Sequence, residues 1–279
     1  MNNPLLQDWD TPFGTPPFKS IETAHFQPAI EIAIRQAAEE IKAIAENINQ
    51  PGFENTIAAL DRTGTRLGII TSVLFNLNNA ETNKELQAVV QEVSPLLTRF
   101  SNDITLNEKL FLRIKHLYES RENLNLNREQ IMLLEKSYRN FMVGGAGLKN
   151  ENKSRFRKIS EELSLLSVKF EENILEDTNS YELHLTDIND LAGLPEGTVE
   201  MSSMEAQNRG KEGWIFTLHA PSYVPFMKYS QRRDLREKIY KAYTSRAFHS
   251  DKYDNRKLAV KIANLRLKLA KILGFRKYS

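Results

Sequence analysis

The sequence contains no cysteine, and this absence removes several classes of chemistry at once. Disulfide bonds and thiolate metal sites are excluded. No apolar run approaches the roughly 20 residues of a membrane-spanning helix, so we expect no membrane association. The first ten residues, MNNPLLQDWD, lack the basic start and apolar stretch of a signal peptide. The lack of cysteine fits either compartment, whereas the lack of a signal peptide favours a cytoplasmic protein, or a periplasmic one if a signal peptide has been removed.

Recognisable catalytic motifs are also missing. None of the five histidines is followed by Glu and no two are four residues apart, so a helical His-Glu-x-x-His zinc site is absent. The sequence also lacks Gly-x-Ser-x-Gly, a phosphate-binding loop and a dinucleotide-binding glycine pattern. The GGAG stretch at 144–147 follows no predicted strand, so we interpret it as a hinge between helices. The residues alone therefore indicate no catalytic constellation.

Charge is distributed unevenly, although the net charge is only +2. Residues 228–279 contain 16 Lys and Arg against 4 Asp and Glu, which leaves a net charge of −10 on residues 1–227. A basic tail can indicate nucleic-acid binding. Here, however, basic residues alternate with apolar ones at helical spacing, and the rest of the chain is acidic. We therefore expect a solvated helical surface and no nucleic acid, with an anionic ligand or an acidic partner domain as the alternative.

Apolar periodicity predicts a mainly α-helical fold. Residues 1–25 are rich in proline and aromatic residues and predict an extended N-terminal arm. Residues 26–279 form one helical region, in which 26–177 and 221–279 are helical and the latter is basic. The predicted helices cover residues 26–48, 54–78, 83–103, 107–121, 127–143, 151–177, 222–230, 232–246 and 254–273.

Residues 178–220 have a different pattern. SYELHLT (180–186) alternates apolar and polar residues, and GWIFTLH (213–219) indicates a second strand. We expect the two to pair as a small two-stranded β ribbon, with a short helix between them.

The last predicted helix has a single apolar face formed by Leu258, Ile262, Leu265, Leu269 and Ile272. Gly274 follows where a helix C-cap glycine belongs. A helix of this kind needs a surface to lie against. It therefore predicts either a partner or a longer protein.

The segment YKAYTSRAF (240–248) carries the candidate binding residues. Tyr240, Tyr243 and Arg246 are three residues apart, so they are expected to share one helical face. The Arg246 guanidinium can hold a carboxylate with two parallel hydrogen bonds. The alternative is a packed aromatic–arginine surface pair with no ligand.

Five stretches in order resemble one family. They are NPLLQDWDTPFGTPPFKSIETAHFQPAIEIAI (3–34), PGFENTIAALDRTGTRLGIITSVLFNLNNAETNKELQAV (51–89), RNFMVGGAGL (139–148), REKIYKAYTSRA (236–247) and NLRLKLAKILGF (264–275). Together they resemble the N-terminal part of zinc metallopeptidases of the thimet oligopeptidase type, in particular the bacterial peptidyl-dipeptidase (dipeptidyl carboxypeptidase) branch.

The resemblance implies a mostly helical enzyme with two lobes on either side of a deep channel that admits short peptides. One zinc ion, held by His-Glu-x-x-His and a downstream Glu, serves the release of dipeptides from the free C-terminus. No position here matches that motif, so no catalytic or zinc-binding residue can be assigned and this chain is expected to bind no zinc and to be inactive alone. Its expected partners are short peptides and a missing C-terminal catalytic domain.

On this interpretation the chain is one wall of the channel, with Tyr240, Tyr243 and Arg246 as channel residues. Helix 254–273 is expected to lie against the missing part, which would leave its apolar face exposed in this chain. Two alternatives remain: the N-terminal part of an oligopeptidase of the same family that cuts internally, and a helical interaction module without catalytic activity.

Overall fold

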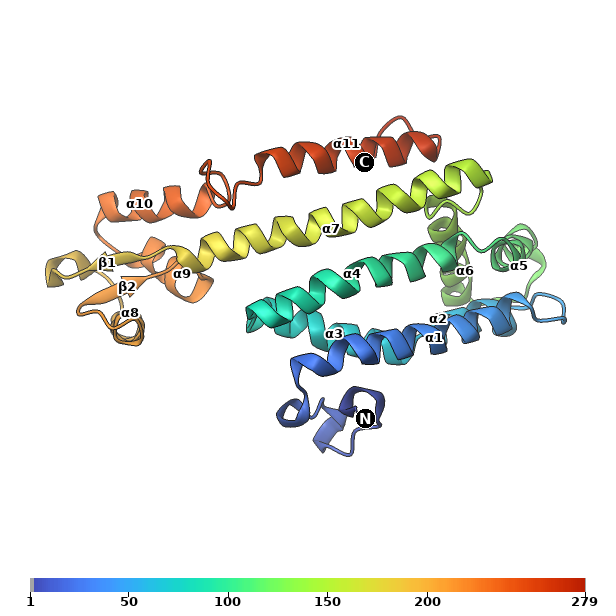
Figure 1. Cartoon of the computed structure of the whole chain (residues 1–279), viewed down its shortest axis with the longest axis horizontal. Helices are drawn as coiled ribbons and strands as arrows, with labels where there is room; N and C mark the ends of the chain where they lie inside the picture. The colour runs from blue at the N-terminus through green and yellow to red at the C-terminus, as the bar shows by residue number, and fades with distance from the viewer. Residues whose placement is uncertain (1–2, 279) are drawn as a thin grey trace. The chain divides into compact units, whose positions relative to one another are not determined.

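The computed structural model describes residues 3–278 and has the expected mainly α-helical fold with one small antiparallel ribbon (Figure 1). The described residues form two compact units. Unit 1 contains residues 3–168 and 263–278, and unit 2 contains residues 169–262. None of the helices within residues 3–278 combines the length and the apolar content that crossing a bilayer requires.

The helices of the first half are α1 (Phe26–Ala45), α2 (Ala59–Arg62), α3 (Thr65–Ala80), α4 (Lys84–Thr105), α5 (Glu108–Glu119), α6 (Arg128–Val143) and α7 (Asn150–Ser180). They are followed by β1 (Leu183–Leu185), α8 (Glu196–Asn208), β2 (Trp214–Phe216), α9 (Ala220–Tyr229), α10 (Arg233–Thr244) and α11 (Arg256–Ile272). Both α7 and α11 contribute residues to each unit.

Helix α1 forms the centre of unit 1. Its buried residues recur every three or four positions, and Ala29, Ala33 and Ala37 make a stripe of small side chains one turn apart. Helices α3 and α4 pack on α1, as Figure 1 shows. Ile30 is completely buried there, which is worth about 1.5–3 kcal/mol of transfer free energy.

The N-terminal arm, predicted to be extended, is instead made of short turns. It contains four short 3-10 turns, at residues 4–6, 12–14, 18–20 and 23–25. Leu5 is fully buried in the core around α1, and the Asn3 amide donates to the carbonyl oxygen of His25 (2.8 Å). The prolines exclude an α-helix but permit single turns, because a turn needs no long run of backbone donors.

The single helix predicted over 54–78 is wrong, because the chain breaks at Thr63 and Gly64. A π-helical turn (Phe53–Ala58) and α2 precede the break, and α3 follows it. Gly64 has φ +71°, a left-handed conformation that glycine adopts without strain. Its N–H donates to Glu40 on α1 (2.9 Å), so a tertiary contact helps to place the break.

The ribbon of unit 2 has the predicted strands and alternation. The register pairs Leu183 with Phe216 and Leu185 with Trp214, and the two leucines are buried while His184 between them is exposed. Gly213 precedes β2 with φ +89°, and a Cβ there would lie 2.3 Å from the carbonyl oxygen of Leu185. Only glycine fits at that position.

The expectation that the apolar face of α11 is exposed is wrong. In unit 1 the residues Leu265 and Leu269 are only 6% and 8% exposed to solvent. Leu269 belongs to a small hydrophobic core with Phe156 of α7. The face is covered by α7 of the same chain. Gly274 has φ +84° and ends the helix as predicted.

Candidate functional site

The predicted pair Tyr243 and Arg246 lies at the end of α10 in unit 2. The guanidinium carbon of Arg246 is 3.9 Å from the centre of the Tyr243 ring. Tyr223 of α9 also contacts the Tyr243 ring. The two rings are stacked, with their centroids 4.1 Å apart and their planes inclined by 12°. Such contacts stabilise both the cation and the ring stack. The three side chains form one layered cluster, which we call the tyrosine–arginine cluster.

Arg246 is held from two sides by its own chain. Its Nε donates to the carbonyl oxygen of Tyr243 (2.9 Å), and its Nη1 donates to the hydroxyl oxygen of Thr178 on α7 (3.2 Å). Nη2 makes no hydrogen bond within residues 3–278. Because Nε is occupied, a carboxylate cannot approach the Nε side of the guanidinium. It can still bind through Nη1, which has one remaining proton, and Nη2, which has two.

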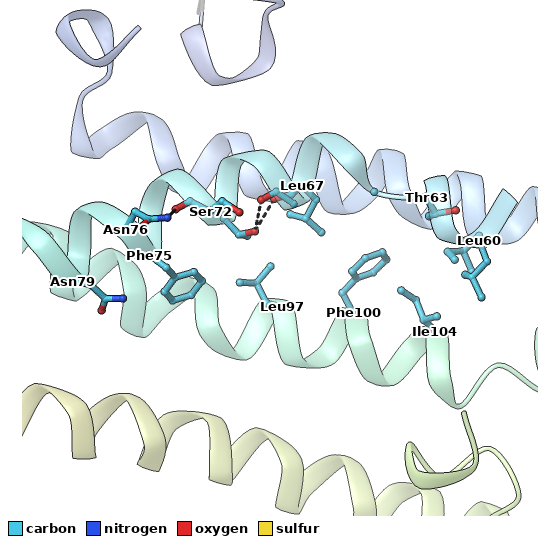
Figure 2. A pocket seen from close by; sticks show the side chains of 14 residues that line it. Leu60, Thr63, Leu67, Ser72, Phe75, Asn76, Asn79, Leu97, Phe100 and Ile104 are labelled. Atoms are coloured by element: carbon cyan, nitrogen blue, oxygen red, sulfur yellow. Dashed lines mark hydrogen bonds between the residues drawn. The ribbon is translucent and has the colours of Figure 1, made fainter. Parts of the chain in front are cut away.

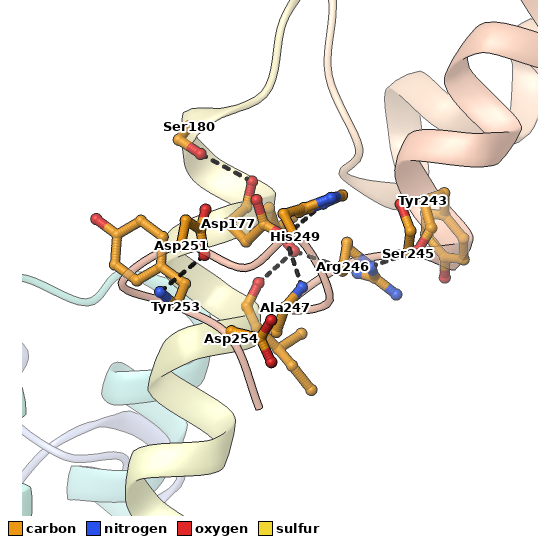
Figure 3. A network of polar contacts seen from close by, with 12 residues as sticks. Asp177, Ser180, Tyr243, Ser245, Arg246, Ala247, His249, Asp251, Tyr253 and Asp254 are labelled. Carbon is orange, nitrogen blue, oxygen red and sulfur yellow. Dashed lines mark hydrogen bonds and ion pairs between the residues drawn. The ribbon is translucent and has the colours of Figure 1, made fainter. Parts of the chain in front are cut away.

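The loop after Arg246 is fastened to the end of α7 (Figure 3). Asp177 accepts a hydrogen bond from the backbone N–H of Ala247 (2.6 Å) and an ion-pair contact from Nε2 of His249 (3.2 Å). Ala247 has φ +53°, an uncommon conformation for a residue with a Cβ. The contact with Asp177 therefore helps to hold a locally strained backbone next to Arg246.

Asn255 closes the same loop from the other end. Its N–H donates to the carbonyl oxygen of Ala247 (2.8 Å) and its side-chain amide donates to that of Phe170 (2.9 Å). Its Oδ1 accepts from the amide of Asn173 (2.8 Å), and both asparagines are buried. These bonds fix the loop against α7 within unit 2.

The surroundings of Tyr223 favour the neutral form of its phenol. Burial, followed by the neighbouring phenols of Tyr243 and Tyr240, raises the pKa of Tyr223, while Arg246 acts in the opposite direction. Tyr223 therefore stays protonated at neutral pH and can donate a hydrogen bond. The cluster offers a carboxylate one positive charge, while Arg246 and Tyr223 already cover the Tyr243 ring.

Of the three predicted residues, Tyr240 is the least engaged. It is 51% exposed, and no ring stacking joins it to Tyr243 among the described residues. Sequence reasoning missed Tyr223 and Thr178, because their contacts depend on how α9 and α7 pack against α10. No local signal identifies either of them. The role of Tyr240, Tyr243 and Arg246 as channel residues stays a prediction.

A polar pocket of about 390 Å³ lies elsewhere in unit 2, between α8, β2 and the start of α9. Ser202, Thr217, Ser222 and His219 line it, but the Ser222 hydroxyl oxygen accepts from the N–H of Thr217 (2.9 Å). His219 makes no hydrogen bond to that hydroxyl within the described part of the chain. The pocket therefore lacks the serine–histidine contact that nucleophilic catalysis needs.

Unit 1 has a larger groove, of about 630 Å³, between α3 and α4. Figure 2 shows Leu97, Phe100 and Ile104 directed from α4 toward α3. Phe75, Asn76 and Asn79 of α3 line the same groove. It offers apolar contacts and amides but no titratable side chain, so it can bind and cannot perform acid–base chemistry.

The described residues do not fit a zinc site. No three His, Asp or Glu side chains within residues 3–278 lie close enough together to hold a metal ion. His184 hydrogen-bonds to the carbonyl oxygen of Glu212 (2.7 Å). His249 faces Asp177, a single carboxylate. Zinc chemistry consequently cannot be derived from these residues.

The chain is similar to known peptidases along its whole length. It is 35% identical to oligopeptidase A of Haemophilus influenzae and 31% identical to a probable cytosolic oligopeptidase A of Arabidopsis thaliana, in both cases over 100% of the chain. It is 33% identical, over 99% of its length, to dipeptidyl carboxypeptidase of Escherichia coli. It covers 41%, 40% and 41% of these three proteins, so it spans about two fifths of their length.

A family profile locates the similarity more narrowly. Residues 30–153, from α1 into the first turn of α7, match the family described as "Neurolysin/Thimet oligopeptidase, N-terminal domain". The five stretches that suggested this family from the sequence extend on both sides of the matched region. The similarity of residues 30–153 is therefore to the N-terminal domain of the neurolysin and thimet oligopeptidase family.

Proposed function

We propose that this chain is the non-catalytic N-terminal region of a zinc metallopeptidase that releases dipeptides from the C-terminus of short peptides. The observation that carries the proposal is the similarity to dipeptidyl carboxypeptidase over 99% of this chain together with the domain match. In this proposal the zinc ligands belong to a catalytic domain that these residues do not supply. The chain contributes one wall of the peptide channel, in the cytoplasm or the periplasm.

Within that wall, the tyrosine–arginine cluster is the proposed peptide contact. A peptide has a carboxylate at its C-terminus, and Arg246 retains free protons on Nη1 and Nη2 for such a group. Tyr240, which is half exposed, adds a hydroxyl and a flat face one helical turn before Tyr243. Because the Thr178 and Tyr243 bonds hold Arg246 in place, little side-chain entropy is lost when it binds.

A second candidate is an oligopeptidase that cuts peptides internally. The similarity to oligopeptidase A of Haemophilus influenzae, at 35% identity, is as strong as that to dipeptidyl carboxypeptidase, at 33%. Both candidates predict the same helical wall and differ in where the peptide is cut.

The decisive experiment starts from the source gene beyond the codon for Ser279. Its complete product is incubated with short peptides that have either a free or an amidated C-terminus, and the products are identified by mass spectrometry. Dipeptides released only from free C-termini support the main proposal, and internal cuts in amidated peptides support the second candidate. A product without a zinc motif or peptidase activity overturns both and favours an interaction module.

The peptide contact is tested separately in that active protein. For Arg246→Gln we expect KM to rise at least about tenfold with a smaller change in kcat, because the charge-assisted hydrogen bonds from Nη1 and Nη2 to the substrate carboxylate are lost. Arg233→Gln is the matched control, since Arg233 is exposed at the start of α10 and forms no ion pair within the described residues. Equal effects of the two substitutions, or none, would remove Arg246 from the channel.

A further inference from the structure

Helices α7 and α11 run antiparallel in unit 1 and leave an open groove between them. The groove has a volume of about 620 Å³ and lies between the first three turns of α7 and the last two of α11. Below it, the contact of Leu269 with Phe156 holds the two helices together. The groove is therefore a feature of two packed helices and not of a loose surface loop.

Both rims of the groove are positively charged. Arg155 and Lys158 of α7 lie three residues apart, as do Lys268 and Lys271 of α11, so each pair follows one helix face. All four side chains are exposed, and none forms an ion pair within residues 3–278. Glu162 is the one carboxylate in the lining, and it already has an interaction of its own.

Neighbouring basic residues behave differently. Arg157, on another face of the same turn of α7, pairs with Asp103 at 2.5 Å. Arg99 pairs with Glu161 at 3.0 Å. Arg157 and Arg99, which lie between α7 and α4, thus have partners, and the four basic residues around the groove do not. Four like charges on facing rims repel each other, and this repulsion is relieved when an anionic ligand binds.

The floor of the groove is aliphatic. Ile159 and Ile272 are half-buried there, and Leu265 is buried. No aromatic side chain lines the groove, whereas single-stranded nucleic acid is bound largely by stacking on aromatic rings. An aliphatic floor between cationic rims instead suits a polypeptide that has carboxylates on its flanks and aliphatic side chains between them.

We propose that this groove binds an acidic amphipathic peptide segment. Its carboxylates pair with Arg155, Lys158, Lys268 and Lys271, and its aliphatic side chains rest on the floor. The one-turn spacing of the rim cations matches Glu residues three or four positions apart on a helical ligand. The groove is in unit 1, whereas the tyrosine–arginine cluster is in unit 2, so this site is independent of the peptidase proposal.

Fluorescence anisotropy on the 279-residue chain tests the proposal with a labelled peptide that has Glu and Leu at helical spacing. The test variant is Lys268→Glu with Lys271→Glu, and the matched control is Lys238→Glu with Lys257→Glu. All four lysines are exposed and form no ion pair in the described part of the chain. We expect the test variant to raise Kd at least about tenfold and the control to change it less than about twofold. Lys268→Gln with Lys271→Gln repeats the test without introducing new charges.

Two further probes separate the ligand classes. Polyglutamate of equal charge lacks aliphatic side chains and should bind more weakly. A single-stranded DNA oligonucleotide of equal charge should also bind more weakly. Absence of saturable binding by the Glu–Leu peptide, or an equal loss in the control variant, overturns the proposal. The proposal is also overturned if polyglutamate binds as tightly as the Glu–Leu peptide, or if DNA binds more tightly and depends on the same lysines. Either result would make the groove a general polyanion site.

Discussion

Arg113 of α5 offers the sharpest test of what holds unit 1 together. This side chain is 8% exposed, and burial lowers the pKa of its guanidinium. Nη1 donates to the carbonyl oxygens of Asn47 (2.8 Å) and Asn49 (3.1 Å), and Nη2 donates to Asn55 Oδ1 (3.0 Å) and Thr56 Oγ1 (3.2 Å). A single buried cation therefore ties α5 to the segment between α1 and α2.

Replacing Arg113 with Met keeps the aliphatic length but leaves these acceptors without their donor. Each bond from a charged donor is worth about 1.5–3 kcal/mol, but not additively, and the freed carbonyl oxygens regain some water. Part of the loss is offset because a buried guanidinium, whose Nε has no partner among the described residues, is removed. We expect a net loss of about 2–4 kcal/mol in the unfolding free energy of unit 1.

The two tryptophans make the assay specific to each unit. Trp9 lies in unit 1 and Trp214 in unit 2, so a Trp214→Phe background leaves Trp9 as the reporter in urea unfolding. Arg62→Met is the control, because its ion pair with Glu54 is about 70% exposed and should contribute less than about 1 kcal/mol. If Arg113→Met shifts the Trp9 transition no more than Arg62→Met does, the reasoning about the buried donor is refuted.

Two further predictions concern a close approach and a titrating group. Gly144→Ala should lower the unfolding free energy by about 1–3 kcal/mol, because its Cβ would lie 2.7 Å from that of Thr105. Gly68→Ala is the control: it has open space around the new methyl group and should be neutral or stabilising by up to about 1 kcal/mol. Equal urea midpoints for the Gly144→Ala and Gly68→Ala variants would contradict the packing argument. The hydrogen bond from Lys211 holds the pKa of Glu182 below its usual range. A carboxylate with a lowered pKa in the folded state stabilises above its unfolded pKa of about 4.3, and this contribution disappears as pH falls through the folded value. Glu182→Gln should therefore lower Tm at neutral pH and flatten the decline of Tm below about pH 4, whereas thermal melts with parallel pH profiles would reject this role.

The positions of most helices could be predicted from the sequence because their determinants are local. Helix α6 was expected over 127–143 and spans Arg128–Val143. Asn127 caps it by accepting from the N–H of Gln130 (2.9 Å), a contact between residues three apart. The break at Gly64 was not predicted, because one of its determinants is a hydrogen bond to Glu40, which is distant in sequence.

In the candidate site, too, the local contact could be predicted from the sequence and the tertiary contacts could not. Tyr243 and Arg246 are three residues apart, and this spacing predicted that they share a face, although Arg246 lies just beyond the end of α10. Tyr223 stacks on Tyr243 from 20 residues away, and Arg246 donates a hydrogen bond to Thr178, which is 68 residues away. Such contacts depend on packing between helices, which a single sequence does not specify.

Helix α11 shows most clearly which features follow from the sequence and which follow from the tertiary structure. The sequence by itself determined that this helix exists, where it ends and that one face is apolar, because helical period and capping are properties of neighbouring residues. Only the tertiary structure decided that α7 covers this face in unit 1 and that the flanking cations form a groove. The hydrophobic effect requires that an apolar face be buried, but it is non-directional and does not select the surface that buries it.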